Sequence, residues 1–225
     1  MKTIIEKTAD GSHTLFVPEL QEHYHSVNGA IQESLHVFIE AGLRYCQKKE
    51  VRIFEIGLGT GLNALLTLLE AKASGRTIYY TGIEKYPVTL LVSNSLNYAN
   101  LTESENESGS FKSIQLVKWN HQIEIDKFFF LTKLNADLTD YSFPENAGFD
   151  LVYFDAFAPE KQPEMWYQNI FEKIYKAMSP EGILVTYCAK GEVRRRMQRC
   201  GFLVERLPGP PGKREMLRAV KPIQA

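Results

Sequence analysis

The glycine-rich turn at residues 57–61 constrains the fold of this chain more than any other feature. Residues 51–56 form an apolar run rich in β-branched side chains, and a leucine-rich helical pattern follows the glycines directly at 62–69. Such a succession predicts a strand, a tight turn and a helix. Glycines suit this turn because they adopt positive φ and carry no Cβ, so a ligand can lie against the backbone. The free N–H groups at the start of the helix would face that ligand.

The glycine spacing, together with two acidic residues, narrows the class of ligand. The order is G-x-G-x-G, whereas the dinucleotide fingerprint G-x-G-x-x-G has a later third glycine that admits a pyrophosphate. Glu55 precedes the first glycine, where it suits a cationic amino group, and Glu84 ends the next strand-like run, where a carboxylate suits ribose hydroxyls. S-adenosylmethionine carries an amine, a carboxylate and a ribose. The alternative is a turn that only lets helix and strand pack closely.

Strand and helix patterns alternate along the rest of the chain. Strands are predicted at 51–56, 77–84, 128–134, 149–154, 183–187, 202–207 and 214–220, and helices after residue 34 to about 46, then at 62–69, 87–100, 163–178 and 190–200. This alternation predicts an α/β fold with a mostly parallel sheet and helices on both faces. The last loop is too short for a crossover helix, so the final two strands should pair antiparallel. A seven-stranded sheet with an antiparallel last strand is the Rossmann-like architecture of class I methyltransferases.

Two segments fall outside this alternation. Residues 4–8 and 13–17 flank Asp10-Gly11, which predicts a β-hairpin. We therefore expect residues 1–30 to form an N-terminal hairpin extension and residues 31–225 to form the methyltransferase domain. The polar segment 102–110 predicts a loop, and the segment just after it suits either a short helix or an extended segment.

A ligand crevice is expected at the carboxyl ends of the first, second and fourth strands. The glycine turn, Glu84 and Asp155 follow those ends. Asp155, together with Phe157 and the backbone near Pro159, suits an amine that must be aimed at a sulfonium methyl group, which is largely a matter of positioning. Asp155 equally suits the amine of the cofactor. Asp137, after the third strand, suits either the adenine edge or the N-cap of the next turn.

The bulk composition bounds the class of protein. With 225 residues, 44% hydrophobic content and a net charge of −1, the chain suits one fair-sized domain that is not a general polyanion binder. No run approaches the roughly 18 apolar residues that span a bilayer, and residues 1–7 lack the apolar core of a signal peptide. Cys46, Cys188 and Cys200 fit no disulfide framework, and no spacing of cysteines or histidines fits a metal site. We expect a cytoplasmic protein with no membrane span and no metal.

Positive charge gathers near the C-terminus. Residues 190–221 carry ten Lys or Arg against three acidic residues, a balance of +7, so the other residues must sum to −8. This C-terminal basic region includes Arg194, Arg195, Lys213 and Arg214, and it suits the phosphates of a nucleic acid. Arg194 and Arg195 equally suit the solvated face of a helix.

Several motifs together resemble the methyltransferase domain of the bifunctional tRNA 5-methylaminomethyl-2-thiouridine biosynthesis (MnmC) family and its stand-alone relatives. The matching strings are YHS at 24–26, ESLHVFI at 33–39, FEIGLGTGLN at 54–63, EKYP at 84–87, FDAFAPEKQPEMW at 154–166, VRR at 193–195, GF at 201–202 and GKREML at 212–217. They cover nearly the whole chain in order, and the F-A-P-x-K-x-P-x-M-W and K-R-E-M-L strings are long enough to be specific.

The resemblance implies methylation, by S-adenosylmethionine, of the aminomethyl nitrogen on the wobble uridine of tRNA. The residues that it implies in cofactor binding are Glu55, Gly57, Gly59, Thr60, Gly61, Asn63, Glu84, Lys85 and Asp137. Those implied in the acceptor pocket are Asp155, Phe157, Pro159 and Lys161, with Glu33 and Ser34 nearby. The tRNA anticodon stem-loop is expected at the C-terminal basic region. The wobble nucleotide would have to leave the anticodon stack.

The chain departs from the bifunctional relatives because it ends at Ala225, where no flavin-dependent (FAD) oxidase domain is expected to follow. The aminomethyl group would then come from another enzyme. The acidic residues at 103–107 should point away from the RNA. The alternatives are an aminopropyltransferase of the spermidine synthase type, a small-molecule amine methyltransferase, a nicotinamide-dependent oxidoreductase and a non-catalytic tRNA-binding module. The basic C-terminal region disfavours the aminopropyltransferase, and the glycine spacing disfavours the oxidoreductase.

Overall fold

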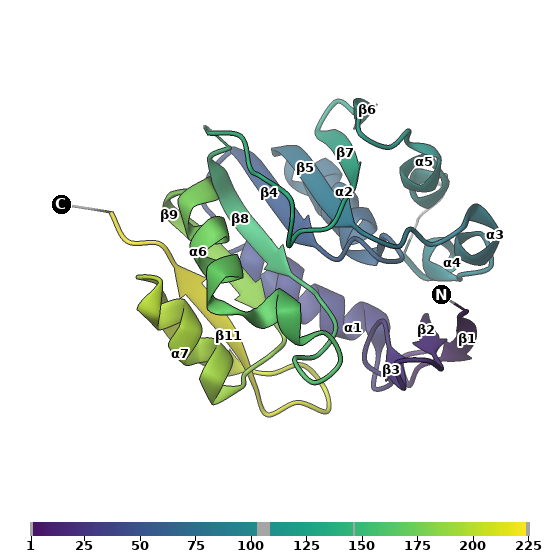
Figure 1. The fold of residues 1–225 in the computed structure, drawn as a ribbon. Coiled ribbons are helices and arrows are strands. Elements are labelled where there is room, and N and C mark those ends of the chain that lie inside the picture. The colour runs from purple at the N-terminus through teal and green to yellow at the C-terminus, as the bar shows by residue number, and fades with distance from the viewer. Residues whose placement is uncertain (1, 103–108, 146, 224–225) are drawn as a thin grey trace.

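A central sheet organises the computed structural model, which describes residues 2–102, 109–145 and 147–223. Within these residues the sheet has eight strands in the order β10-β11-β9-β8-β4-β5-β7-β6 (Figure 1). Their bounds are β4 Glu50–Ile56, β5 Thr77–Glu84, β6 Gln122–Asp126, β7 Phe129–Asn135, β8 Phe149–Phe154, β9 Met178–Thr186, β10 Leu203–Pro208 and β11 Glu215–Val220. The acidic segment 103–107 lies outside the described residues.

The strand directions confirm the predicted class I methyltransferase architecture. Strands β9, β8, β4, β5 and β7 run parallel to one another, and β11 runs antiparallel between β9 and β10. The prediction of seven strands was wrong by one, because β6 pairs antiparallel with the edge strand β7. The residues of β6 alternate polar and apolar at a sheet edge and are mostly exposed, so they lack the apolar run that marks a buried strand.

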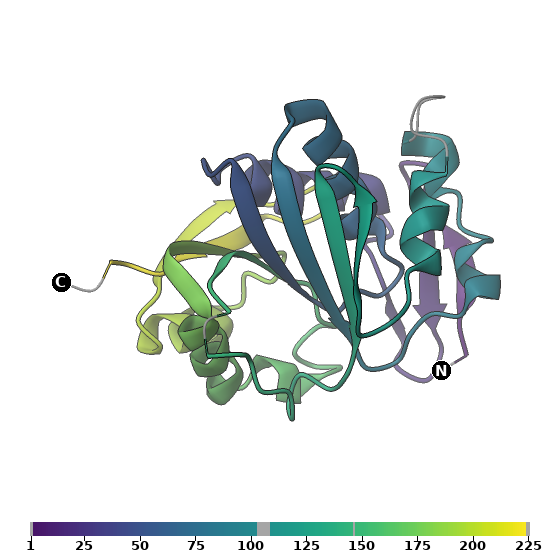
Figure 2. The same ribbon diagram turned by 90° about the horizontal axis from the view of Figure 1, so that it is seen from above.

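Helices cover both faces of the sheet, as predicted. On one face lie α2 (Leu62–Ser74) and a helix that starts as α1 (Ala30–Ser34) and continues as the π-helix η1 (Leu35–Leu43). On the other face lie α6 (Gln168–Ala177) and α7 (Gly191–Arg199) (Figure 2). Each face has its own buried apolar cluster. A strand such as β4 is therefore buried on both sides, which is why its sequence reads as an apolar run.

Local structure differs from the prediction around Pro87. The helix predicted from 87 to 100 is instead α3 (Leu90–Ser93), capped by the Thr89 hydroxyl, and α4 (Tyr98–Thr102). The segment between them serves a tertiary contact: Asn97 accepts from His13 N at 2.8 Å and donates to Gly11 O at 3.0 Å. The segment after the polar residues 102–110, for which the sequence allowed a short helix or an extended segment, forms a helix, α5 (Ser110–Leu116).

The predicted helix at 163–178 is also interrupted. It consists of the 3-10 helix η3 (Pro163–Trp166) followed by α6, and strand β9 already begins at Met178, five residues earlier than expected. Tyr167, between the two helices, has extended backbone angles. No helix in the described part of the chain is both long and apolar enough to cross a bilayer.

The predicted N-terminal hairpin is present and gains a short third strand. Strands β1 (Ile4–Lys7), β2 (His13–Val17) and β3 (Glu22–His23) form a separate antiparallel sheet, which lies beside α3 and α4 (Figures 1 and 2). The domain boundary expected at residue 30 stays a prediction.

The hairpin turn caps helix α1. Asp10 Oδ2 accepts from Gln32 N at 3.0 Å, and Ser12 Oγ accepts from Ala30 N at 3.2 Å. These bonds satisfy N–H groups that a helix start leaves without partners. At Gly29, the residue before the helix, a Cβ would lie 2.8 Å from Asp10 Oδ2, so the close approach requires glycine. The hairpin is therefore fixed to the helix that borders the sheet.

We expect Asp10→Ala to lower the free energy of unfolding by about 1–2 kcal/mol, as loss of a helix cap does. Burial acts to raise the pKa of Asp10, but hydrogen bonds from Ser12 and Gln32 lower it overall. The stabilisation should therefore be present at neutral pH and be lost as the pH falls below the ordinary value of 3.8. Urea unfolding at several pH values measures this, with Glu19→Ala, an exposed acid of the same segment, as control. Equal loss in both variants would contradict the capping role.

Candidate active site

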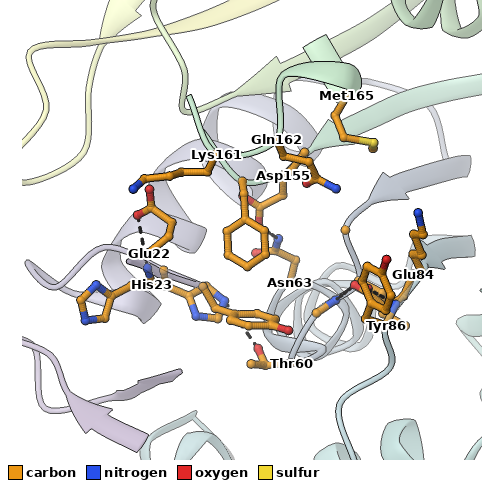
Figure 3. A pocket seen from close by; sticks show the side chains of 18 of the residues that line it. Glu22, His23, Thr60, Asn63, Glu84, Tyr86, Asp155, Lys161, Gln162 and Met165 are labelled. Atoms are coloured by element: carbon orange, nitrogen blue, oxygen red, sulfur yellow. Dashed lines mark hydrogen bonds between the residues drawn. The ribbon is translucent and has the colours of Figure 1, made fainter. Parts of the chain in front are cut away.

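A cavity of about 670 Å³ opens at the carboxyl ends of the parallel strands (Figure 3). Residues that directly follow β4, β5, β7, β8 and β9 line it, together with the segment around β3 and a lysine from the loop between β10 and β11. In Figure 3, Asp155 and Asn63 point toward each other, with Glu84 and Tyr86 on one side and Glu22, His23 and Lys161 on the other. This volume is within the range of small-molecule sites.

The structure brings most of the predicted site residues together. Those that line the cavity are Glu33, Gly57, Gly59, Thr60, Asn63, Glu84, Lys85, Asp137, Asp155, Phe157, Lys161 and Lys213. Those that do not line it are Ser34, Glu55, Gly61, Pro159, Arg194, Arg195 and Arg214. The individual roles assigned to these residues stay predictions.

The glycine turn is shaped by close contacts with two other segments. Gly57 has φ +83°, and a Cβ there would lie 2.6 Å from the carbonyl oxygen of Asp155. At Gly59 a Cβ would lie 3.1 Å from the ring of Tyr24. Asp155 N also donates to Ile56 O at 3.0 Å, so the chain after β8 is fastened to the end of β4. The predicted cofactor turn and the predicted acceptor aspartate are therefore in contact.

Glu84 links the second strand to the glycine turn. Its carboxylate accepts from Gly59 N at 3.0 Å and from Tyr86 N at 2.8 Å. Burial raises the pKa of Glu84, although these backbone hydrogen bonds oppose the shift. Each carboxylate oxygen retains a further lone pair, so Glu84 can still accept hydroxyl groups from a ligand in the cavity.

Asp137 caps the turn that follows it, which is one of the two roles predicted from its sequence position, and it also lines the cavity. Its Oδ1 accepts from the backbone N and the hydroxyl of Thr139, which caps the turn, and its Oδ2 lies 2.6 Å from Lys85 Nζ. Burial acts to raise the pKa of Asp137, but the hydrogen bonds from Lys85 and Thr139 lower it overall. The residue is thus an anion at neutral pH, and it lines the cavity as well as capping the turn.

Asn63 joins two acids at the centre of the site. Its Nδ2 donates to Glu55 Oε1 and to Asp155 Oδ2, both at 2.9 Å. Glu55 is fully buried behind Asn63, and burial raises its pKa well above the ordinary value. Burial also raises the pKa of Asp155, to about 7, and the nearby charge of Glu33 adds to this shift. Asp155 is therefore a carboxyl group that can take or give a proton near neutral pH.

The same asparagine provides a test of whether a cofactor fits. Asn63 is 3% exposed and lines the cavity, and its Oδ1 has no hydrogen-bond partner among the described residues. A buried acceptor of this kind costs free energy unless a ligand donates to it. The amino group of S-adenosylmethionine is such a donor, and Glu84 and the glycine turn border the same cavity. The residues present fit this cofactor.

Two side-chain hydrogen bonds hold the backbone of the loop after β8 in place. Trp166 is fully buried, and its Nε1 donates to Phe157 O at 2.7 Å. Tyr187 Oη donates to Ala156 O at 2.8 Å. Pro159 belongs to the turn of this loop rather than to the cavity wall. The motif therefore fixes the backbone around Asp155, as positioning of an acceptor requires.

Sequence reasoning did not assign several residues that line the cavity. Tyr24 packs edge-on against Phe157, with ring centroids 5.1 Å apart, and Tyr187 forms another part of the wall. His25 also lines the cavity, and burial lowers its pKa to about 4, so its ring is neutral at pH 7. Tyr187 is the last residue of a predicted parallel strand, and that position was the available signal.

The predicted nucleic-acid contacts separate into different places. Arg194 and Arg195 lie on α7, outside the cavity, with Arg195 exposed and Arg194 partly buried. Arg214 is exposed, whereas Lys213 points into the cavity and pairs with Glu33. Within the described ranges no cluster of three or more His, Cys, Asp or Glu side chains has the arrangement of a metal site.

We expect Gly57→Ala to weaken S-adenosylmethionine binding by at least about tenfold, or 1.4 kcal/mol, because its Cβ would displace the loop that carries Asp155. Isothermal calorimetry measures the affinity. Gly75→Ala is a matched control: its φ is +69°, and the nearest atom to a Cβ, in Phe128, is 4.0 Å away. It shares the backbone strain without the clash. Equal affinity in both variants would show that the contact between turn and loop does not shape the site.

A solved structure shares the whole fold. The chain is similar to MnmC2 from Aquifex aeolicus, with a TM-score of 0.81 and 26% identity, over 100% of this chain and 71% of that one. It is more distantly similar to spermidine synthase from Thermotoga maritima, with a TM-score of 0.54 and 14% identity, over 99% of this chain and 74% of that one. At that identity the second likeness concerns the fold alone.

The sequence is similar to part of larger curated proteins. It is 30% identical, over 215 residues, to the tRNA 5-methylaminomethyl-2-thiouridine biosynthesis bifunctional protein MnmC of Burkholderia multivorans, covering 91% of this chain and 33% of that protein. The chain thus spans about a third of the length of the curated relatives that it matches.

A family match agrees with the geometry of the site. Residues 110–222, from α5 to just beyond β11, match the sequence model of a family described as S-adenosyl-L-methionine-dependent methyltransferase. The matched region includes strand β8, which Asp155 directly follows, and the final antiparallel pair of β10 and β11. The glycine turn, Asn63 and Glu84 border the same cavity as Asp155. The chain belongs to the S-adenosyl-L-methionine-dependent methyltransferase family.

Proposed function

We propose that this protein transfers the methyl group of S-adenosylmethionine to the aminomethyl nitrogen of a tRNA wobble uridine. The reaction would convert 5-aminomethyl-2-thiouridine to 5-methylaminomethyl-2-thiouridine. The observation that carries the proposal is the contact between the glycine turn and Asp155, which places a carboxyl group and an aromatic wall beside the cofactor end of one cavity. The similarity to relatives named for the biosynthesis of 5-methylaminomethyl-2-thiouridine in tRNA supports this choice of product.

The cofactor end is assigned from the chemistry of its donors and acceptors. S-adenosylmethionine supplies an electrophilic methyl group. Asn63 Oδ1 would accept from its amino group, Glu84 would accept its ribose hydroxyls, and the backbone at Gly57 and Gly59 would lie against it. Lys85 and Asp137 would border the adenine edge. Glu55 would act from behind, by fixing the amide of Asn63.

The acceptor end must deliver an amine lone pair. An alkylamine has a pKa near that of lysine, about 10, so it reaches the site mainly as a cation that the carboxylate of Asp155 attracts. Asp155 then takes one proton from the ammonium, which leaves a neutral nitrogen with its lone pair. Phe157 and Tyr24 bound this end with aromatic surface. They keep water away and give the uracil ring a flat surface.

RNA binding is assigned to the rim and to the C-terminal basic region. The wobble nucleotide must unstack to bring its substituent into a cavity of this depth. Arg194, Arg195 and Arg214 would hold phosphates of the anticodon stem-loop, and Lys161 would contact the nucleotide at the cavity mouth. A tRNA substrate of this kind makes the cytoplasm the proposed site of action.

We expect Asp155→Ala to lower the rate of methyl transfer at least about a hundredfold, because it removes the group that orients and deprotonates the amine. Because burial raises the pKa of Asp155 to about 7, and its carboxylate is the active form, wild-type activity should rise as the pH increases through this value. Mass analysis of wobble nucleosides after incubation with S-adenosylmethionine and aminomethyl-containing tRNA measures the product.

The control for this variant is Asp140→Ala, an exposed acid near the cavity that does not line it. Circular dichroism should show both variants folded. Full activity of Asp155→Ala would overturn the assignment. Transfer of an aminopropyl group from decarboxylated cofactor, with no methyl transfer by the wild-type protein, would favour the aminopropyltransferase alternative.

We also expect Arg194→Glu combined with Arg195→Glu to weaken tRNA binding and to flatten its dependence on salt, since fewer phosphate counterions are released. Affinity measured across a salt series tests this. Lys49→Glu with Arg52→Glu makes the same change in charge at the amino end of β4, away from the cavity, and serves as the control. Equal slopes for the two double variants would show that α7 is only a solvated helix face.

A further inference from the structure

Lys213 differs from the other residues of the C-terminal basic region. Sequence patterning groups it with Arg194, Arg195 and Arg214 as a phosphate contact. In the structure it lines the active-site cavity, while Arg214 beside it is exposed. The position of the Lys213 side chain therefore indicates a role inside the site.

The ammonium group of Lys213 has two partners in the cavity. It forms an ion pair with Glu33 Oε1, and it lies 3.9 Å from the ring centroid of Tyr187, a favourable cation–π distance. Glu33 is only 7% exposed, and its Oε2 accepts from Ser26 N at 2.8 Å. Both oxygens of this buried carboxylate are thus occupied. Without Lys213, Glu33 would be a buried charge with no cation beside it.

The loop that carries Lys213 is held in place at several points. Gly209 N donates to Arg214 O at 3.1 Å, and Lys213 N donates to Pro210 O at 2.9 Å. Gly212 has φ +83°, and any side chain there would collide with Asn28. The fold of this loop consequently sets the position of the ammonium group, and Lys213 is not a freely rotating surface side chain.

Both members of this ion pair affect the pKa of Asp155. Several titratable groups face Asp155 from the elements around it: Glu33 of α1, Glu55 of β4, Tyr80 of β5, Tyr187 after β9 and Lys213 of the β10–β11 loop. Lys161 lines the same cavity. Burial and the charge of Glu33 raise the pKa of Asp155, and Lys213 acts in the opposite sense. Two carboxylates thus share one neighbouring cation.

We propose that Lys213 is a positioning residue of the acceptor site: it neutralises Glu33 and so leaves Asp155 as the carboxylate that meets the acceptor amine. This inference rests on the proposed function, because it concerns the same amine. Without Lys213, Glu33 and Asp155 would hold a proton between them, since like charges in one buried site disfavour double ionisation. The amine would also be drawn to Glu33 instead of Asp155.

The test compares Lys213→Met, Lys213→Arg and the double variant Lys213→Met with Glu33→Gln. The measured quantity is kcat/KM for methylation of aminomethyl-containing tRNA, expressed as the ratio of variant to wild type from pH 6 to pH 9. Ionisation of the substrate amine is common to all the proteins and cancels in this ratio. Thermal unfolding confirms that each variant is folded.

For Lys213→Met we expect a ratio about tenfold lower at pH 6 than at pH 9, as a shift of about one unit in the pKa of Asp155 requires. Lys213→Arg retains the charge and should show a nearly constant ratio. The double variant removes both charges, and its ratio should regain a nearly flat profile. A merely structural lysine would lower the rate equally at every pH.

Other outcomes would overturn the inference. A ratio for Lys213→Met that is independent of pH, with a reduced salt dependence of tRNA binding, would make Lys213 a phosphate contact. Failure of Glu33→Gln to restore the profile would exclude action through Glu33. Carbon-13 NMR titration of the Asp155 carboxyl gives a readout without substrate: its midpoint should rise in Lys213→Met and return in the double variant. If wild-type protein methylates no tRNA, the proposed function fails, and this titration still decides the effect of Lys213.

Discussion

The contact between the turn after β4 and the loop after β8 is the constraint on which the rest of the site depends. A Cβ at Gly57 would lie 2.6 Å from Asp155 O, and Asp155 N is bonded to Ile56 O. Neighbouring parallel strands end at the same edge of the sheet, so the two segments meet there. Only a residue without a side chain allows them to meet this closely. One backbone contact thus joins the proposed cofactor end of the cavity to the proposed acceptor end.

Around this contact the protein gathers carboxylates in a poorly solvated place. Glu33, Glu55, Glu84 and Asp155 all lie in or behind the cavity wall, and burial raises the pKa of the last three. An isolated buried charge costs free energy. In this site hydrogen-bond and ion-pair partners reduce that cost. Asn63 donates to two of the acids, backbone N–H groups bond Glu84, and Lys213 pairs with Glu33. The remaining negative charge suits ligands that arrive as cations, which both a sulfonium cofactor and an alkylamine are.

The N-terminal segment is part of this arrangement as well as an addition to the sheet. Its hairpin turn caps helix α1 through Asp10 and Ser12, and that helix carries Glu33. Between the hairpin and this helix the chain passes the glycine turn, where Tyr24 lies against Gly59 and Phe157. Changes in the hairpin can therefore alter the position of this part of the cavity wall, although β1 itself is exposed and does not line the cavity.

Local sequence determined the seven predicted strands, the glycine turn and the acids that follow the strand ends. Apolar runs mark the strands, glycines mark a turn with positive φ, and the alternation of strands and helices gives the positions of the acids. Tertiary structure decided the features that local pattern does not encode. Strand β6 forms because an edge of the sheet is available, and the helix predicted at 87–100 breaks where Asn97 binds the hairpin. Lys213 looks like a surface base in sequence, yet it turns inward because Glu33, 180 residues away in the chain, presents a buried carboxylate to it. Periodicity and propensity report on neighbours in sequence, whereas the pairing of charges across a cavity depends on which distant segments the sheet brings together.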